Sequence, residues 1–329
     1  MTERKNSPVF VVGCHRSGTA LLYDTLLSAG GFALYHGVPF VHTSLLPKCG
    51  NPAVPGNRDK ILQTWLRSKP FRRTGLEVDY FRSRMQEWRT GGDFLRITLG
   101  EVARRQGAQR WAAYDPDNIM HIPTVKREVP DALFVHVVRD GRDAALSLRK
   151  QHRDLALLPW DRNRTLFGWA LNWQWTVRKG RRYGQMFPRD YIEVRYEELV
   201  EEPEKTLRNL GGFLEHDFDY GRIQNAGIGR VGSPNTVWKE ESKGETFSPV
   251  NRWKTKLPQP EIAALEALIG DCLEEFGYSL STRSSRLDPR VRLMSVIYPT
   301  YFETKLFLKS KTVLGRLIRA ERLELTNPA

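Results

Sequence analysis

The sequence of 329 residues predicts a P-loop-like, doubly wound α/β fold: a parallel sheet of about five strands flanked by helices. Three observations lead to this prediction. Short apolar runs that are continuous rather than alternating are typical of strands buried on both faces. Segments with helical periodicity stand between these runs. The first run leads through a glycine-containing turn directly into a helical segment.

The expected strands share a largely apolar composition: residues 9–12, 32–35, 111–114, 133–138 and 191–194. The expected helices lie at residues 19–27, 143–150, 166–180 and from Pro203 onward, where a proline in the first turn is favourable. Within the third helix, Trp169 and Trp173 recur at helical spacing, which predicts core packing rather than an aromatic platform for a ligand.

Three segments depart from this alternation. Residues 38–110 are rich in proline, arginine and aromatic residues, and we expect an acceptor-binding insertion there, with extra packing as the alternative. A second, shorter insertion is expected at 152–164. Residues 1–282 then form one α/β domain, and residues 283–329 form a helical, amphipathic extension.

The extension is basic, with ten Lys and Arg against four Asp and Glu. Packing on the domain or on a partner subunit, as in a homodimer, is the favoured role. Peripheral attachment to a membrane surface is the alternative.

Composition limits the remaining classes. The net charge of +13 favours an anionic ligand, a nucleic acid or a membrane surface. No segment resembles a nucleic-acid-binding module, so no nucleic-acid partner is expected. Cys14, Cys49 and Cys272 are too widely spaced for a zinc site or a disulfide framework. The chain shows neither a signal peptide nor an apolar run long enough to span a bilayer, which predicts a cytoplasmic protein.

The turn after the first strand, residues 13–20 (GCHRSGTA), has the glycine spacing of a phosphate loop. Glycines free the backbone, and the amides of the following helix N-terminus can point at an anion. A nucleoside-triphosphatase loop also needs Lys after the second glycine and then Ser or Thr for Mg²⁺, but this chain has Thr19 and Ala20 there. The positive charge lies within the loop instead, at Arg16. The sequence therefore predicts a metal-free site for a phosphate-like group, with a simple tight turn as the alternative.

A second cluster follows the fourth strand, where FVHVVRDGRDAALS places Arg139 at the strand end and Ser147 in the next helix. Both can reach one small anion at the carboxyl edge of the sheet, where open α/β folds bind ligands. The alternative is an ion pair between Arg139 and Asp140 or Asp143.

These motifs together resemble the sulfotransferases that use 3′-phosphoadenosine 5′-phosphosulfate (PAPS), in the bacterial and Golgi-like branch. HRSGT is similar to the family's PRSGT or PKSGT loop, with His15 at the usual proline, and the run from Arg139 to Ser147 is similar to its RD-x6-S element. YIEVRYEELVEEP resembles the family's strand-plus-tyrosine segment, and NRWK at 251–254 resembles its closing segment. The resemblance covers about residues 7–280.

The resemblance implies a role for each matched residue. Arg16, Ser17, Gly18 and Thr19 would hold the 5′-phosphosulfate, and Arg16 would stabilise charge that develops as the sulfuryl group leaves. The 3′-phosphate would be bound by two residues, Arg139 and Ser147. Tyr196 would lie near the nucleotide. No metal is expected.

The general base is less clearly marked. Related enzymes with an arginine loop have a Glu about twenty residues beyond that arginine, whereas this chain has His36 there. Because an imidazole accepts protons near neutral pH, His36 is the candidate base. His42 and Asp115 are the alternatives, and His121 is expected to be structural.

The predicted function is transfer of a sulfuryl group from PAPS to a hydroxyl or amine of a small-molecule, glycan or lipid acceptor. One alternative is a P-loop kinase or NTPase with a degenerate loop. Another is a basic nucleic-acid or membrane-binding protein without catalysis. The sequence selects neither the acceptor nor O- over N-sulfation.

Overall fold

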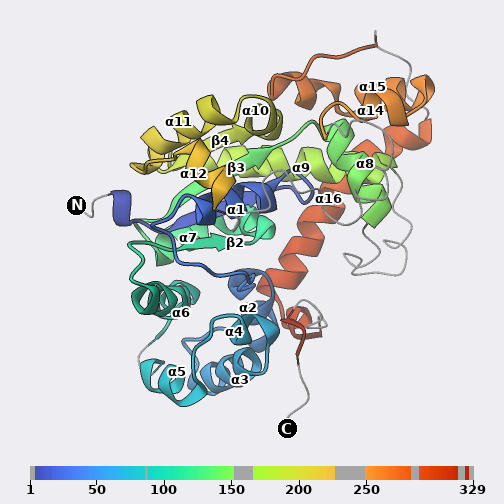
Figure 1. The fold of residues 1–329 in the computed structure, drawn as a ribbon. Coiled ribbons are helices and arrows are strands. Elements are labelled where there is room, and N and C mark those ends of the chain that lie inside the picture. The colour runs from blue at the N-terminus through green and yellow to red at the C-terminus, as the bar shows by residue number, and fades with distance from the viewer. Residues whose placement is uncertain are drawn as a thin grey trace.

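The computed structural model describes residues 4–85, 88–151, 166–226, 249–282, 289–317 and 323–325. At its centre lies a parallel sheet with the strand order β2-β1-β3-β4 (Figure 1). The strands are β1 (Val9–Gly13), β2 (Ala112–Tyr114), β3 (Leu133–Val138) and β4 (Tyr191–Arg195). The parallel sheet flanked by helices confirms the predicted fold class, with four strands in place of about five.

The expected strand at residues 32–35 is reduced to one isolated parallel bridge between Phe32 and Arg110. The backbone groups of Leu34 bind the side chain of Gln106 instead of a neighbouring strand. Leu34 N donates to Gln106 Oε1 at 2.6 Å, and Gln106 Nε2 donates to Leu34 O at 3.1 Å. A side-chain amide thus takes the place of a strand ladder, and the sheet ends at β2.

Alternate residues of β1 face opposite layers, as expected for a strand covered on both sides. Val9 and Val11 pack against one layer of helices, whereas Phe10 and Val12 face the other side. The first layer consists of α1 (Thr19–Ser28), α10 (Tyr196–Glu201), α11 (Pro203–Leu214) and α12 (Tyr220–Asn225). The second includes α6 (Gly91–Gln106), α7 (Ile122–Glu128) and η3 (Pro116–His121), a 3₁₀ helix.

A further group of helices packs around α9 (Leu166–Gly184). Trp169 and Trp173 of α9 are 3% and 0% exposed within this group, which confirms their prediction as core residues. Its other helices are α8 (Gly141–Gln151), α14 (Trp253–Lys256), α15 (Gln259–Glu275) and α16 (Pro289–Lys311).

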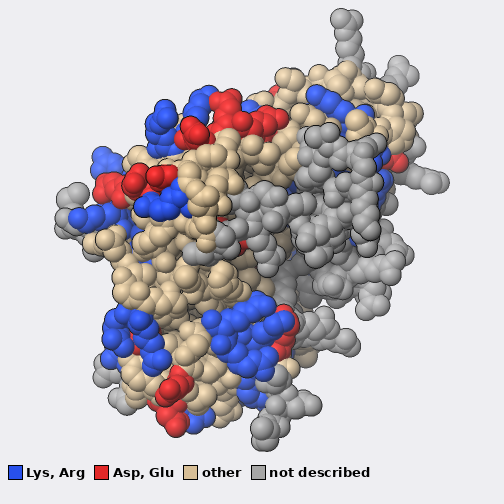
Figure 2. All heavy atoms as spheres, viewed as in Figure 1, with Lys and Arg blue, Asp and Glu red and all other residues tan. Residues whose placement is uncertain are grey.

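The segment 38–110 folds as a compact helical unit beside the sheet (Figure 1). Besides α6 it contains η2 (Val41–Leu45, a π-helical turn), α2 (Leu46–Cys49), α3 (Pro55–Leu66), α4 (Lys69–Arg72) and α5 (Val78–Arg84). Its aromatic residues Trp65, Phe81 and Trp88 are buried around Phe94. These rings therefore form a core rather than a surface for an acceptor. Lys and Arg gather on the face over α4 (Figure 2).

The C-terminal residues are joined to the body at two places. Helix α16 packs on α9 through Phe302, and Leu323 is buried in the core of the 38–110 unit. Lys69 Nζ pairs with Glu324 at 2.5 Å. The extension thus packs on its own domain. The remaining short helices are η1 (Arg4–Asn6) and η5 (Val313–Leu317). The insertion expected at 152–164 lies outside the described residues.

Candidate functional site

The turn from β1 into α1 depends on two glycines that approach other parts of the site closely. A Cβ on Gly13 would lie 2.5 Å from Val137 O on the neighbouring strand. Gly18 has φ +91°, and a Cβ there would lie 2.1 Å from Cδ2 of Tyr196. Because the residue before α1 is glycine, no side chain caps the first amides of this helix. The turn therefore presents backbone N–H groups where an anion can bind them.

Arg16 joins the two predicted anion sites. Its backbone is in the left-handed region (φ 69°), and its Nε donates to Ser147 Oγ at 3.1 Å, across 131 residues of sequence. Burial lowers the pKa of the Arg16 guanidinium, and the nearby charges of Arg139 and Arg252 lower it further. Two further guanidinium groups thus act on that of Arg16, an arrangement that an anion would stabilise.

Arg139 is 2% exposed, and its side chain is directed toward the loop. Its Nη1 donates to Arg16 O at 3.0 Å, and its Nη2 donates to Pro249 O at 2.7 Å. The guanidinium carbon lies 4.6 Å from the ring centroid of Tyr196. Since this ring also contacts Gly18, Tyr196 packs between the loop and the end of β3.

The acidic neighbours of Arg139 divide into two groups. Asp140 pairs with Arg142 at 2.7 Å and not with Arg139. Asp143 Oδ2 lies 3.8 Å from Arg139 Nη2, so an ion pair exists but is long. Burial raises the pKa of Asp143 to about 6, against the opposing effect of Arg139. This carboxyl is therefore largely ionised at pH 7 and takes up its proton as the pH falls through about 6.

Ser17 is 0% exposed, and its Oγ has no hydrogen-bond partner among the described residues. A buried hydroxyl without a partner carries a free-energy penalty that a bound anion would remove. The neighbouring Thr19 is buried and hydrogen-bonds to the side chain of Tyr114 at the end of β2. Of the two loop hydroxyls, that of Ser17 can therefore bind a ligand directly, whereas that of Thr19 already has a hydrogen bond to Tyr114.

His36 is exposed and follows the short extended segment beside β2. Because Phe32 bridges Arg110 in the parallel sense, the chain runs toward the carboxyl edge of the sheet as it reaches His36. Arg73 Nη1 donates to the His36 carbonyl oxygen at 3.1 Å. His36 therefore lies on the edge that carries Arg16, beside the 38–110 unit.

A second histidine, His15, belongs to the loop itself, where its only mark in the sequence is that it replaces the family's usual proline. His15 Nε2 lies 3.0 Å from Asp117 Oδ1, which belongs to the first turn of η3. The two side chains are 27% and 31% exposed. A carboxylate can orient an imidazole for proton transfer, so His15 is a further candidate base. The unusual His in HRSGT was the only sequence signal for it.

The alternative bases have other contacts. Asp115 is 0% exposed, accepts a hydrogen bond from Thr43 Oγ1 at 2.5 Å and caps η3. His42 is 4% exposed, and its Nε2 lies 2.8 Å from Glu128 Oε2. Both residues hold the connection between the 38–110 unit and the sheet.

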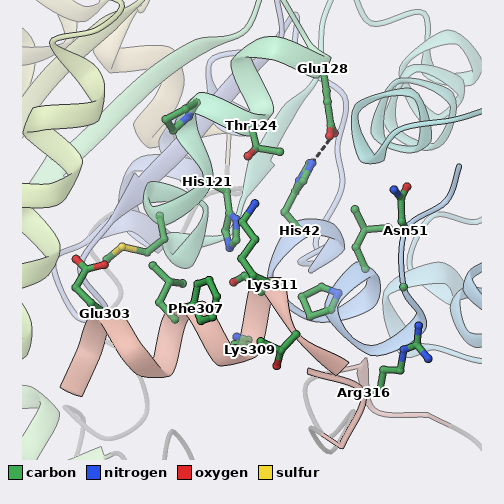
Figure 3. A pocket seen from close by; sticks show the side chains of 18 of the residues that line it. His42, Asn51, His121, Thr124, Glu128, Glu303, Phe307, Lys309, Lys311 and Arg316 are labelled. Atoms are coloured by element: carbon green, nitrogen blue, oxygen red, sulfur yellow. Dashed lines mark hydrogen bonds and ion pairs between the residues drawn. The ribbon is translucent and has the colours of Figure 1, made fainter. Parts of the chain in front are cut away.

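A cavity of about 670 Å³ lies between η2, η3, α7 and α16 (Figure 3). His42, His121 and Glu128 form one wall, and Phe307, Lys309 and Lys311 of α16 form the opposite wall. Since Asp117 and His121 are four residues apart on η3, the cavity lies about 8 Å along this helix from the His15 contact. The cavity thus adjoins the loop site without containing it.

His121 lies inside this wall, and Lys311 reaches toward it from α16 (Figure 3). Burial, together with the charges of His42 and Lys309, lowers the pKa of His121 to about 3. The imidazole is therefore neutral at physiological pH. Within the described residues, no three His, Cys, Asp or Glu side chains are grouped to hold a metal ion.

The fold and the turn place this protein in the class of P-loop-like α/β proteins whose loop lacks the lysine and metal-binding hydroxyl of ATP-binding loops. The model of the sulfotransferase family matches residues 8–220, and the chain belongs to the sulfotransferase family. This match confirms the family that the sequence motifs predicted.

Individual relatives are distant. One from Caenorhabditis briggsae, provisionally named a protein-tyrosine sulfotransferase, is 24% identical over 209 residues, or 63% of this chain. This chain spans 65% of that relative, which is less than two thirds of its length. Protein-tyrosine sulfotransferase 1 of Danio rerio is 23% identical over 270 residues, covering 73% of this chain and 74% of the relative.

The sulfotransferase domain of the olefin synthase from Synechococcus PCC 7002 has a similar fold, with a TM-score of 0.56 at 21% identity. The alignment covers 83% of this chain and 96% of that domain. At this identity the likeness concerns the fold alone.

Proposed function

We propose that this protein transfers a sulfuryl group from PAPS to a hydroxyl or amine of a small-molecule, glycan or lipid acceptor. The observation that carries the proposal is the contact between Arg16 and Ser147, with Arg139 bound to the backbone of Arg16. Two motifs far apart in sequence form one cationic cluster at the carboxyl edge of the sheet. A nucleotide with phosphate groups at both its 5′ and 3′ positions matches such a cluster.

In this proposal, the loop residues Arg16, Ser17, Gly18 and Thr19 hold the 5′-phosphosulfate. Arg16 and the amides at the start of α1 stabilise negative charge on the bridging oxygen as the sulfuryl group leaves. The unpartnered hydroxyl of Ser17 supports this role. The charge is supplied by the protein itself, so the proposed transfer uses no metal.

Arg139 and Ser147 hold the 3′-phosphate, which is the group that distinguishes PAPS from ATP. A guanidinium is suited to this because its fork can donate two hydrogen bonds to phosphate oxygens. Tyr196 keeps Arg139 in place through its ring. Protonation of Asp143 releases Arg139 further for an anion.

The acceptor reaches the loop from the side of the 38–110 unit, where His36 accepts its proton. His15, held by Asp117, is the competing base. The cavity lined by His42 and His121 offers space for the rest of an acceptor. The names of the relatives add the hydroxyl of a protein tyrosine to the acceptors within this proposal.

A calorimetric titration tests the nucleotide part. The protein should bind 3′-phosphoadenosine 5′-phosphate without metal and more tightly than ATP with Mg²⁺. Arg139→Ala and Ser147→Ala should weaken this binding, by about tenfold or more for the arginine. Arg82→Ala on α5 is the matched control and should bind as the wild type does, because Arg82 is exposed and lies outside the site. Tighter binding of ATP with Mg²⁺ would favour the kinase alternative.

Ser147→Ala separates loss of the site from loss of the fold. Removing one hydroxyl from a helix leaves the packing intact, whereas Arg139→Ala empties a buried position. If both variants fold and both retain the wild-type affinity, the cluster does not bind the nucleotide.

A further inference from the structure

The exposed apolar residues of this protein are concentrated in its C-terminal helices. Thirteen large apolar side chains are exposed in the described part of the chain, and eight of them belong to α16 or η5. These eight are Leu293, Val296, Ile297, Phe307, Leu308, Val313, Leu314 and Leu317. Such a concentration on a water-exposed surface marks a site of interaction.

The five residues of α16 lie on one side of the helix. Counted from Leu293, they follow at +3, +4, +14 and +15, and Lys311 follows at +18, which keeps all of them on one helical face. The opposite side of the helix contacts the body: Phe302 is buried there, and Glu303, although 49% exposed, binds Lys179 of α9 at 2.5 Å. Apolar residues therefore lie on both faces of α16, and among the residues that the structure describes only one face has a partner.

The charge of this region is one-sided. Residues 289–317 contain six Lys and Arg and a single acidic residue, Glu303. Glu303 is directed toward the body, where it also accepts a hydrogen bond from Trp175 Nε1 at 2.8 Å. The exposed basic residues Arg292, Lys311 and Arg316 lie among the exposed apolar ones. We name these eleven residues the α16 surface.

We propose that the α16 surface docks onto an anionic lipid surface, with α16 lying along the plane of the membrane. Apolar side chains enter the interfacial region of a bilayer while lysine and arginine bind acidic headgroups. No helix of the described ranges has both the length and the apolarity to cross a membrane, so the contact is peripheral.

A second copy of the chain fits this surface less well. In a twofold-symmetric dimer, the same patch would face itself and bring two strongly basic regions together. An anionic lipid surface instead supplies the missing negative charge.

The α16 surface also adjoins the cavity, since four residues belong to both: Phe307, Lys311, Val313 and Arg316. Docking would therefore bring the mouth of the cavity close to the membrane. The proposal itself does not depend on the sulfuryl-transfer reaction.

Vesicle co-sedimentation of the full chain tests the proposal. The protein should bind vesicles of phosphatidylcholine mixed with phosphatidylglycerol, and should bind them at least about tenfold more tightly than pure phosphatidylcholine vesicles. High salt should weaken the binding. The double variant Ile297→Asp/Phe307→Asp should lose it, and Lys311→Glu should weaken it about tenfold. Val78→Asp, an exposed apolar residue on α5, is the control and should bind as the wild type does.

Circular dichroism must show that each variant is folded, as expected from the 51% and 59% exposure of Ile297 and Phe307. Equal binding to both kinds of vesicle, or to neither, would overturn the proposal. A second contrary result would combine two observations: the wild type does not bind vesicles, and it is a dimer in sedimentation velocity whereas the double variant is a monomer. The surface would then belong to a contact with a second copy. None of these measurements requires nucleotide, so they stand apart from the proposed function.

Discussion

Asp143 lies at the point where two opposing electrostatic effects meet, and its replacement by Asn tests which effect is larger. Burial raises the pKa of this carboxyl from 3.8 to about 6, while Arg139 at 3.8 Å acts to lower it. The structure therefore indicates that desolvation outweighs the attraction of the guanidinium. The backbone N–H of Trp253 donates to Oδ1 of Asp143 at 2.8 Å. In Asp143→Asn, the side-chain amide oxygen can still accept this hydrogen bond, but the side chain no longer titrates.

The sign of the effect follows from the direction of the shift. A carboxyl with a raised pKa in the folded state binds its proton more tightly there than in the unfolded chain. Its stabilising contribution is complete below the unfolded pKa of 3.8 and is lost as the pH rises through about 6. A shift of about two units corresponds to about 3 kcal/mol in the free energy of unfolding. The wild type should thus lose about 3 kcal/mol relative to Asp143→Asn between about pH 4 and about pH 7.

Urea denaturation at a series of pH values measures this difference. The other titrating groups are common to both proteins and largely cancel. A difference that does not change with pH would show that Asp143 titrates normally. A wild type that gains stability over the variant as the pH rises would show that the pair with Arg139 dominates, and the argument from burial would be refuted.

Three further predictions concern the loop, the base and the C-terminal anchor. Gly18→Ala should destabilise the protein by about 2–4 kcal/mol and abolish nucleotide binding, because the residue is at φ +91° and its Cβ would meet the Tyr196 ring. Thermal unfolding measures the stability and calorimetry the binding, and unchanged binding would contradict the geometry. His36→Gln should lower kcat about 100-fold and remove the acidic limb of the pH–rate profile, whereas His15→Gln should leave that limb in place. The reverse result would assign the role of general base to His15. Glu266→Gln should lower the free energy of unfolding by about 3 kcal/mol, because this 4% exposed carboxylate pairs with a buried arginine of α8 and accepts hydrogen bonds from residues 281 and 282. A change below about 1 kcal/mol in urea denaturation would contradict this.

Local sequence was sufficient wherever one element determines a residue's position. The continuous apolar runs predicted β1 and β3 because a strand buried on both faces has no polar alternation. Arg16 and Arg139 were predicted to lie at one edge because parallel strands end on the same side of a sheet. Helical spacing placed Trp169 and Trp173 in the core, and both are buried.

Tertiary structure decided the features that depend on which distant residues meet. The Arg16–Ser147 hydrogen bond and the His15–Asp117 contact join residues 131 and 102 positions apart, and no local pattern encodes either distance. The segment after Phe32 is not a strand because the side chain of Gln106 takes its backbone hydrogen bonds.

The same reason explains the insertion and the extension. Aromatic composition alone did not show that Trp65 and Trp88 would be buried in one core, where both contact Phe94. Nor did basic composition show that α16 would bury one apolar face and expose another. Periodicity fixes the face of its own helix on which a side chain lies, but only the folded chain determines whether another surface covers that face.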